Sequence, residues 1–196
     1  MAHYDLRVPF VEKGIVEALK AGDKISLTGT IYTARDAAHK RIKQELEEGS
    51  FHYFPLTGAV IYYCGPTPAP PGRVIGSAGP TTSYRMDPYV SLLVQHGVKG
   101  FIGKGKRSQE VKEVLKTHGG VYLIATGGAG ALLSTRILSA KVIAYPDLGP
   151  EAIFEFYVKD FPVIVGIDTH GNDIYEIGPS MWLNTLQKNP LNPSER

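Results

Sequence analysis

One turn organises this chain, and it reads Gly79-Pro80-Thr81-Thr82-Ser83-Tyr84-Arg85-Met86-Asp87-Pro88. Gly79-Pro80 is a turn signal that ends the preceding segment, and Pro88 suits the first position of a helix. Asp87 is the expected N-cap of that helix, whose apolar residues continue as far as His96-Gly97. The turn therefore brings two hydroxyls and one cation to a helix N-terminus.

Two interpretations of this turn remain open. Free backbone N–H groups and the helix dipole favour bound anions, so Thr81, Thr82 and Arg85 fit an anion site with a hydroxyl placed for proton transfer. Alternatively, the loop is simply polar, and Arg85 pairs with Asp87.

A second cation lies at the start of another helix. Residues 35–48 predict a long amphipathic helix that follows a strand at residues 24–32, with Thr33 as its N-cap. Arg35 in the first turn opposes the helix dipole, so it either pairs with Asp36 or is kept for another anion. His39 shares the face of Arg35, a spacing that is more typical of a hydrogen-bonded structural histidine than of a catalyst.

A third cation follows the strand predicted at residues 98–102, in Gly103-Lys104-Gly105-Lys106-Arg107-Ser108. The glycines beside Lys104 allow close backbone approach to a ligand, and Ser108 is the expected cap of the next helix. The G-x-x-x-x-G-K-[ST] spacing of phosphate-binding loops is absent, which argues against nucleotide binding.

Composition narrows the class of protein. The 196 residues, 43% hydrophobic and 20% charged, indicate one globular domain, and a net charge of +2 without a basic block argues against nucleic acid. A single cysteine, Cys64, excludes an internal disulfide or a cysteine-ligated cluster built from this chain alone, and it fits a buried apolar position better than a reactive thiol. No apolar run reaches the ~18 residues of a membrane span, and no signal-peptide pattern opens the chain, so we expect a cytoplasmic protein.

Strands and helices alternate through the middle of the chain, which predicts an α/β domain with ligand groups at the strand-to-helix turns. We expect one domain over residues 1–186 and a loosely ordered tail over 187–196. Other predicted elements are a helix at 11–19, strands at 73–77, 142–145, 152–158 and 162–167, and a hairpin-type turn at 168–173.

At these motifs the chain resembles a known family. Gly79-Pro80-Thr81-Thr82-x-x-Arg85-Met86-Asp87 resembles the signature of the β subunit (C-terminal domain) of class I iron–sulfur fumarate hydratases and L-tartrate dehydratases. Further stretches agree in order, and together they span roughly residues 5 to 175: 26–30, 35–39, 61–66, 104–108, 127–128, 144–149, 151–153 and 160–162. One departure is Lys106, where the family usually has Asn.

The resemblance implies a swivelling β/β/α fold and reversible addition of water to a C4-dicarboxylate, with fumarate/malate the expected pair and tartrate the alternative. It implies that Arg35 and Arg85 hold substrate carboxylates, and that Lys104 helps to hold the substrate and stabilises carbanion-like charge. Thr81 would be the candidate base, although a free hydroxyl needs Arg85 to stabilise its alkoxide. Thr82 would donate a hydrogen bond, with supporting roles for His39, Asp36 and Asp87.

The resemblance also implies a partner. In the family, three cysteines of an α subunit hold a [4Fe–4S] cluster, so we expect no metal on this chain and an assembly of two α and two β chains. Two rival hypotheses remain: a dicarboxylate-binding module without catalysis, and a purely structural partner subunit.

Overall fold

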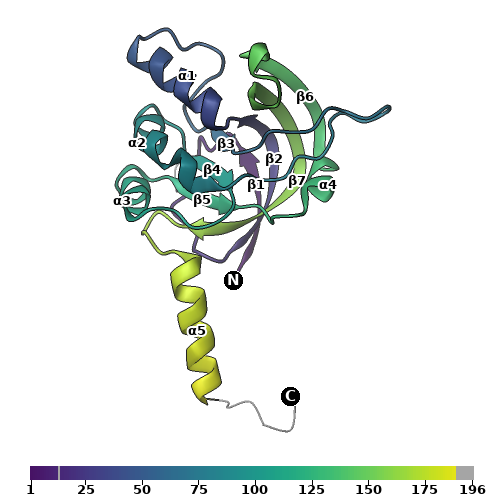
Figure 1. Cartoon of the computed structure of the whole chain (residues 1–196). Coiled ribbons are helices and arrows are strands. Elements are labelled where there is room, and N and C mark those ends of the chain that lie inside the picture. The colour runs from purple at the N-terminus through teal and green to yellow at the C-terminus, as the bar shows by residue number, and fades with distance from the viewer. Residues whose placement is uncertain (13, 189–196) are drawn as a thin grey trace.

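Seven strands form one sheet that closes on itself in the computed structural model, which describes residues 1–12 and 14–188 (Figure 1). The strands are β1 (His3–Val8), β2 (Lys24–Thr33), β3 (Val60–Tyr62), β4 (Gly100–Gly103), β5 (Val121–Ile124), β6 (Ile137–Ala144) and β7 (Ile153–Ile167). Their order is β1-β2-β3-β4-β5-β7-β6, and β7 also pairs with β2. Because β7 is antiparallel to both β5 and β2, it closes the parallel β2–β5 strands into a small barrel.

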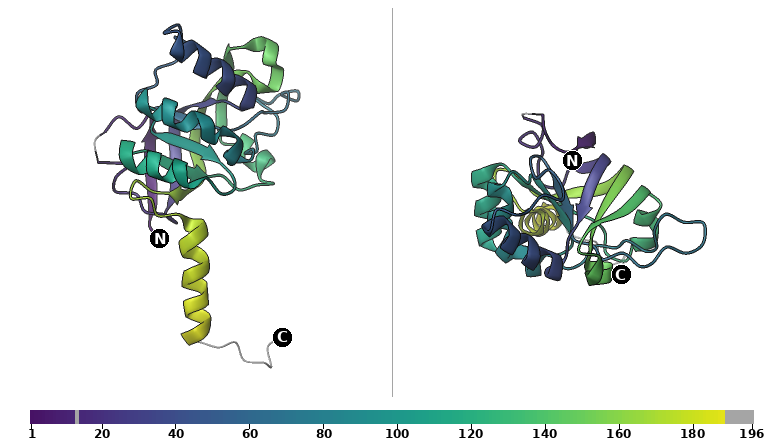
Figure 2. Two further views of the ribbon diagram at one scale, coloured as in Figure 1. Left: turned by 60° about the vertical axis from the view of Figure 1, so that its left-hand side comes forward. Right: turned by 90° about the horizontal axis from the view of Figure 1, so that it is seen from above.

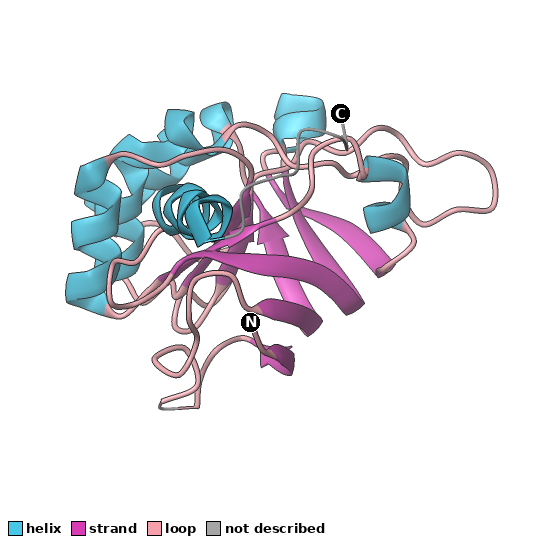
Figure 3. Cartoon of the chain, turned by 90° about the horizontal axis from the view of Figure 1, so that it is seen from below, coloured by secondary structure: helices cyan, strands magenta, loops and turns pink. Residues whose placement is uncertain are grey.

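The helices lie mainly on one face of this sheet (Figure 3). They are α1 (Asp36–Glu47), α2 (Asp87–Gln95), α3 (Gln109–His118), α4 (Gly130–Ser134) and α5 (Ile174–Lys188), with 3₁₀ segments η1 (Ser83–Met86) and η2 (Pro146–Glu151). The predicted mixed α/β domain is confirmed.

Side chains that alternate between the two faces of the sheet form two hydrophobic cores. On β3, Val60 and Tyr62 belong to a core enclosed by the barrel, with Ile31 and Phe156. The intervening Ile61 belongs to a second core, to which α1, α2 and α3 contribute buried apolar residues. Since successive strand side chains point to opposite faces, one short strand serves both cores.

The prediction of a helix at residues 11–19 is wrong: the described residues of this segment form turns. Val16 and Leu19 are buried as their spacing suggests, but Gly14 has φ +84°, a left-handed value that interrupts a helix. The predicted strand at 73–77 is also wrong. This segment is a loop, because two of its N–H groups bond to Thr67 rather than to a neighbouring strand. The Gly76 N–H donates to the Thr67 carbonyl (3.1 Å), and the Ser77 N–H donates to the Thr67 hydroxyl (2.7 Å).

The two strands predicted at 152–158 and 162–167 are one continuous strand, β7, in which Asp160 has φ +50°. A turn does follow it at residues 168–172, stabilised by the buried carboxylate of Asp168, which accepts the N–H groups of His170 and Asn172. This turn leads into α5 rather than into another strand.

Helix α5 projects away from the rest of the domain in two views (Figures 1 and 2). The helix extends to Lys188, and the remaining residues of the predicted loose tail, 189–196, lie outside the described residues. No helix in the described ranges has both the length and the apolar character needed to cross a membrane.

Candidate functional site

Backbone pairing brings the Gly79–Pro88 turn beside the loop that carries Lys104. The Thr81 N–H donates to the Tyr63 carbonyl at the end of β3 (2.7 Å), and the Ser83 N–H donates to the Lys104 carbonyl (3.0 Å). Thr82 and Lys104 also form a parallel bridge. Since β3 and β4 are parallel neighbours, the loops that follow them lie at the same edge of the sheet, as the sequence predicts.

Asp36 links the two predicted carboxylate-binding arginines. Its Oδ1 lies 3.3 Å from Arg85 Nε, and its Oδ2 lies 3.8 Å from Arg35 Nη2. Arg85 Nη2 donates to the Thr81 hydroxyl at 2.7 Å. The alternative in which Arg85 pairs with Asp87 is therefore wrong, because Asp36 takes that place. We call Arg35, Asp36, Thr81, Arg85 and Lys104 the clamp.

The clamp is open to solvent. The side chains of Arg35, Arg85 and Asp36 are 26%, 38% and 40% exposed, so their charges are accessible to a ligand. No carboxylate of the described residues lies within ion-pair distance of Lys104 Nζ. A Cβ on Gly127 would be in ordinary van der Waals contact with Lys104, 3.4 Å from Cδ and 3.9 Å from Nζ, so Gly127 lies directly beside this side chain.

Arg35 has a second carboxylate neighbour that sequence reasoning missed. Glu151 Oε1 lies 3.4 Å from Arg35 Nη2, closer than the 3.8 Å between that nitrogen and Asp36 Oδ2. The side chain of Arg35 also lies against Gly65, where a Cβ would approach its Cδ and Nη1 to 3.0 Å. Arg35 itself, rather than the predicted Thr33, occupies the N-cap position of α1, without a side-chain capping bond.

Thr33 has another use in the fold. Its hydroxyl donates to the Ala152 carbonyl (3.3 Å) and accepts the Phe154 N–H (2.9 Å). These bonds join the end of β2 to the start of β7, so they compete with the capping role that the local sequence suggested.

His39 is buried beneath the clamp. Its Nδ1 donates to the Arg35 carbonyl at 2.8 Å, and its ring lies 5.5 Å from the ring of Tyr63 and 5.3 Å from that of Tyr89. Nε2 is buried without a hydrogen-bond partner among the described residues. Burial lowers the pKa of His39 to about 4, so the ring is neutral at pH 7. A neutral, buried ring suits the orienting role predicted for it better than charge stabilisation.

Asp87 does not cap α2 as predicted; it is the first residue of that helix, and Met86 holds the N-cap position. Its carboxylate instead accepts from Arg107 Nε (2.6 Å) and from the Ser108 N–H (2.8 Å). The buried Arg107 guanidinium requires a carboxylate partner, and this requirement outweighs the preference of Asp87 to cap its own helix.

Arg107 also lies over two aromatic rings. Its guanidinium carbon is 5.3 Å from the centroid of Tyr63 and 4.9 Å from that of Tyr122. The Tyr122 hydroxyl donates to the Gly105 carbonyl and is hydrogen-bonded to the Ser83 hydroxyl, both at 2.9 Å. We call Asp87, Arg107, Tyr63 and Tyr122 the anchor, because they join the loop of Lys104 to the turn of Thr81.

Sequence reasoning assigned no role to Arg107 or Glu151, although both lie in stretches that carry the family resemblance. Ser108, by contrast, caps α3 as predicted, since its hydroxyl accepts the Val111 N–H. The capping signal is local, whereas the partners of Arg107 and Glu151 come from distant parts of the chain.

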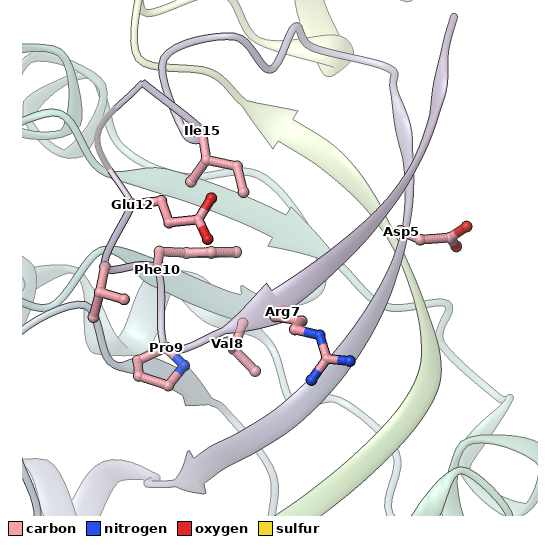
Figure 4. A pocket seen from close by; sticks show the side chains of 8 residues that line it. Asp5, Arg7, Val8, Pro9, Phe10, Glu12 and Ile15 are labelled. Carbon is pink, nitrogen blue, oxygen red and sulfur yellow. The ribbon is translucent and has the colours of Figure 1, made fainter.

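A pocket of about 480 Å³ lies between β1 and the loop that follows it (Figure 4). It is lined by Asp5, Arg7, Val8, Pro9, Phe10, Val11, Glu12 and Ile15, and it contains none of the predicted site residues. A broader hollow of about 800 Å³ adjoins the anchor and is lined by Tyr84, Asp87, Pro88, Lys106, Arg107, Ser108 and Glu110. Lys106, the residue that departs from the family pattern, is exposed at this hollow.

The described residues do not fit an iron–sulfur cluster. Cys64 is fully buried, and burial raises the pKa of its thiol to about 12, which disfavours the thiolate that binds iron. Within residues 1–12 and 14–188, no group of three or more His, Cys, Asp or Glu side chains is arranged to hold a metal ion.

Comparison with known proteins identifies the family of this chain. Residues 3–178 match the family model described as Fumarase C-terminus. The chain is 43% identical over 155 residues to the anaerobic class I fumarate hydratase of Escherichia coli strain K12, covering 78% of this chain and 28% of that protein. It is 41% identical over 156 residues to fumarate hydratase 2 of Leishmania major, with coverage of 79% and 28%.

A third relative is of similar length to this chain. It is a Methanocaldococcus jannaschii protein provisionally named L(+)-tartrate dehydratase subunit beta, 39% identical over 167 residues, covering 82% of this chain and 86% of that protein. The chain thus spans only 28% of the two fumarate hydratases, but most of the tartrate dehydratase subunit.

Proposed function

The chain belongs to the Fumarase C-terminus family, and on that premise we propose that it is the beta unit of a hydro-lyase that reversibly hydrates fumarate to malate. The observation that carries this proposal is the bridge formed by Asp36. One carboxylate lies between two arginines, and one of those arginines donates to a threonine hydroxyl. Two cations beside a hydroxyl suit a dianionic substrate that loses or gains a proton.

In the proposed reaction Arg35 and Arg85 bind the two carboxylates of the substrate. When malate is dehydrated, the alkoxide form of Thr81 takes the proton from carbon, and the electron pair of that C–H bond forms the double bond as hydroxide leaves the neighbouring carbon. The hydroxide then takes a proton from the Thr81 hydroxyl and departs as water, which regenerates the alkoxide. Arg85 supports this step because its Nη2, 2.7 Å from the Thr81 oxygen, stabilises the alkoxide form. In hydration the same hydroxyl returns the proton to carbon.

Lys104 stabilises the negative charge that develops on the substrate when the proton leaves. No carboxylate of the described structure neutralises the Lys104 ammonium, so its positive charge can act on the substrate. Electrostatic catalysis requires such a positioned charge. Thr82 lies beside it and is proposed as a further hydrogen-bond donor. Asp36 orients the two arginines within the clamp, and His39 supports Arg35 from α1.

We propose that a partner supplies the rest of the site. The two fumarate hydratase relatives are far longer than the matched segment. The match covers 28% of each protein, so the remaining 72% is available to supply the other groups of an active site. An α partner that holds a [4Fe–4S] cluster fits this division, since the described part of this chain offers no cluster ligands. In that assembly the beta unit would move as a swivelling domain against its partner.

Dehydration of L-tartrate is the second candidate. It is favoured by the Methanocaldococcus jannaschii relative, of which the chain covers 86%. Both substrates are four-carbon dicarboxylates, so both fit the same pair of arginines. The exposed Lys106 adds a positive charge near the site and is a candidate for the residue that distinguishes them.

The test is anaerobic reconstitution of this chain with its cysteine-rich partner. Fumarate hydration and tartrate dehydration are measured for wild-type protein and for Arg85→Ala. Arg41→Ala is a matched control, because the Arg41 side chain is 39% exposed, against 38% for Arg85, and is likewise paired with an aspartate, Asp147, but lies outside the clamp. Fumarate turnover that requires both chains and is lost only in Arg85→Ala supports the proposal.

Other outcomes separate the alternatives. Turnover of tartrate alone keeps the mechanism and changes the substrate. Tight dicarboxylate binding by this chain alone, measured by calorimetry, without turnover in the assembly supports a binding module. Full activity of Arg85→Ala supports a purely structural subunit and contradicts the proposal.

A further inference from the structure

Glu151 uses both oxygens of its carboxylate on the start of α1. Oε2 accepts the Ala37 N–H at 3.0 Å, and Oε1 lies 3.4 Å from Arg35 Nη2. Glu151 belongs to η2, more than a hundred residues further along the chain, at a sequence separation of 114 from Ala37. It therefore caps a helix that has no side-chain cap of its own and at the same time contacts the arginine that begins it.

The contact limits where the guanidinium of Arg35 can lie. On one side is Gly65, where a Cβ would approach Arg35 Nη1 and Cδ to 3.0 Å, closer than an ordinary van der Waals contact. On another side is Glu151, and the Glu151 carboxylate is itself fixed by the Ala37 N–H. The Arg35 side chain is 26% exposed, so one part of it still faces solvent.

We propose that Glu151 is a positioning residue that directs Arg35 toward one carboxylate of the substrate. The inference rests on the proposed function. Asp36 cannot do this alone, because its carboxylate is shared with Arg85 and lies 3.8 Å from Arg35. A long, flexible arginine loses less conformational entropy on binding when a fixed carboxylate already orients it.

The chain contains a matched control for this contact. Asp147, in the same η2 segment, pairs with Arg41 of the same helix α1, at 2.8 Å (Nη1–Oδ1) and 2.5 Å (Nη2–Oδ2). That pair joins the same two elements but lies outside the clamp, with side chains 39% and 60% exposed. A general loosening of η2 from α1 would affect both pairs, whereas orientation of Arg35 concerns Glu151 alone.

The experiment measures KM, kcat and melting temperature of the assembled enzyme for Glu151→Gln and Asp147→Asn. Glutamine keeps a carbonyl oxygen for the Ala37 N–H and removes the charge. We expect Glu151→Gln to raise KM about fivefold, the effect of one partly exposed ion pair, with kcat within about twofold. Asp147→Asn should leave KM unchanged.

A double-mutant cycle tests whether Glu151 acts through Arg35. In an Arg35→Lys background the further change Glu151→Gln should raise KM by less than about twofold, because the oriented guanidinium is already gone. Additive effects overturn the inference. If Glu151→Gln does not fold, Glu151→Asp retains the charge on a shorter arm; it should raise KM, and an unchanged KM overturns the inference.

The two proposals fail differently. Active wild-type enzyme with an unchanged KM in Glu151→Gln overturns the positioning role and leaves the proposed function intact. Equal increases in KM for Glu151→Gln and Asp147→Asn also overturn it, in favour of general loosening. Wild-type assembly that turns over neither fumarate nor tartrate overturns the proposed function, and the role of Glu151 with it.

Discussion

The clamp and the anchor each contain an arginine–carboxylate pair, and both pairs involve the turn around Arg85 and Asp87. In the clamp, Arg85 and Asp36 are 38% and 40% exposed and lie 3.3 Å apart. In the anchor, Arg107 and Asp87 are 0% and 13% exposed and lie 2.6 Å apart. One turn thus carries an arginine–carboxylate pair that is exposed to solvent and another that is buried, through residues only two positions apart in the sequence.

The difference in exposure between the two pairs shows that one stabilises the fold and the other is available to bind a ligand. A solvent-exposed pair contributes little to folding and exchanges its partner easily, so a substrate carboxylate can replace that of Asp36. A buried pair cannot lose one partner without leaving an uncompensated charge. The anchor therefore holds the turns in place, and the clamp remains available to a ligand.

The largest effect is expected from breaking the anchor. Arg107→Ala should lower the free energy of unfolding by about 3–5 kcal/mol, because it leaves the Asp87 carboxylate buried without its partner. Arg85→Ala should lower the free energy of unfolding by no more than about 1 kcal/mol, because its ion pair is exposed to solvent. Urea denaturation of the two variants measures both values, and equal losses would remove the distinction between anchor and clamp.

The next effect concerns activity rather than folding. Arg85→Ala should reduce kcat/KM of the assembled enzyme roughly 10²- to 10³-fold, the usual result of removing one group that stabilises charge in a transition state. Steady-state kinetics and circular dichroism on the same sample check that activity is lost while the fold is kept. A variant that loses both would show that Arg85 belongs functionally to the anchor.

A smaller effect should appear in the pH dependence of stability, through the histidine that lies between the two regions. His39 has a folded pKa of about 4, below its ordinary unfolded value near 6.5, so between these values the unfolded state binds the extra proton. Its contribution is fully present above pH 6.5 and is lost as pH falls toward 4, up to about 3 kcal/mol.

The measurement is the free energy of unfolding of wild-type protein and His39→Gln at pH 4.5 and 7. Wild-type protein should lose more stability than the variant on acidification. Identical pH profiles would show that His39 is not the group responsible. Exposed histidines such as His52 and His96 are present in both proteins, so they cancel in the comparison.

The smallest effect is an absence of reaction at Cys64, which is buried close to the clamp. Burial raises the pKa of the thiol to about 12, so the reactive thiolate is scarce at pH 8. Iodoacetamide should leave the native chain unmodified and should alkylate it in denaturant, as followed by mass spectrometry. Rapid alkylation of native protein would show that the open region extends beneath the clamp.

Much of the candidate site could be predicted because its signals are local. The Gly79–Pro88 turn, the cap at Ser108 and the glycines around Lys104 depend on residues a few positions apart. The strand-to-helix pattern then places successive loops at one edge of a parallel sheet. These local features are sufficient to predict that the loops carrying Thr81, Arg85 and Lys104 lie close together.

Predictions were wrong where long-range contacts overrode a local preference. Asp87 has the position and chemistry of an N-cap, yet Arg107, twenty residues away, takes its carboxylate. Thr33 likewise bonds to Phe154 of the last strand and to Ala152, just before that strand, instead of capping α1. At residues 11–19 the apolar spacing indicated the buried side but not the backbone, because Gly14 adopts a left-handed conformation.

The sequence by itself determined the class of fold, the three cationic loops and the family. Only the tertiary structure decided which carboxylate each arginine meets: Asp36 for Arg85, Asp87 for Arg107 and Glu151 for Arg35. Residue type and neighbouring spacing set turns and caps, because those depend on nearby backbone groups. Ion pairs between distant segments depend on how the barrel closes, and a linear pattern does not contain that geometry.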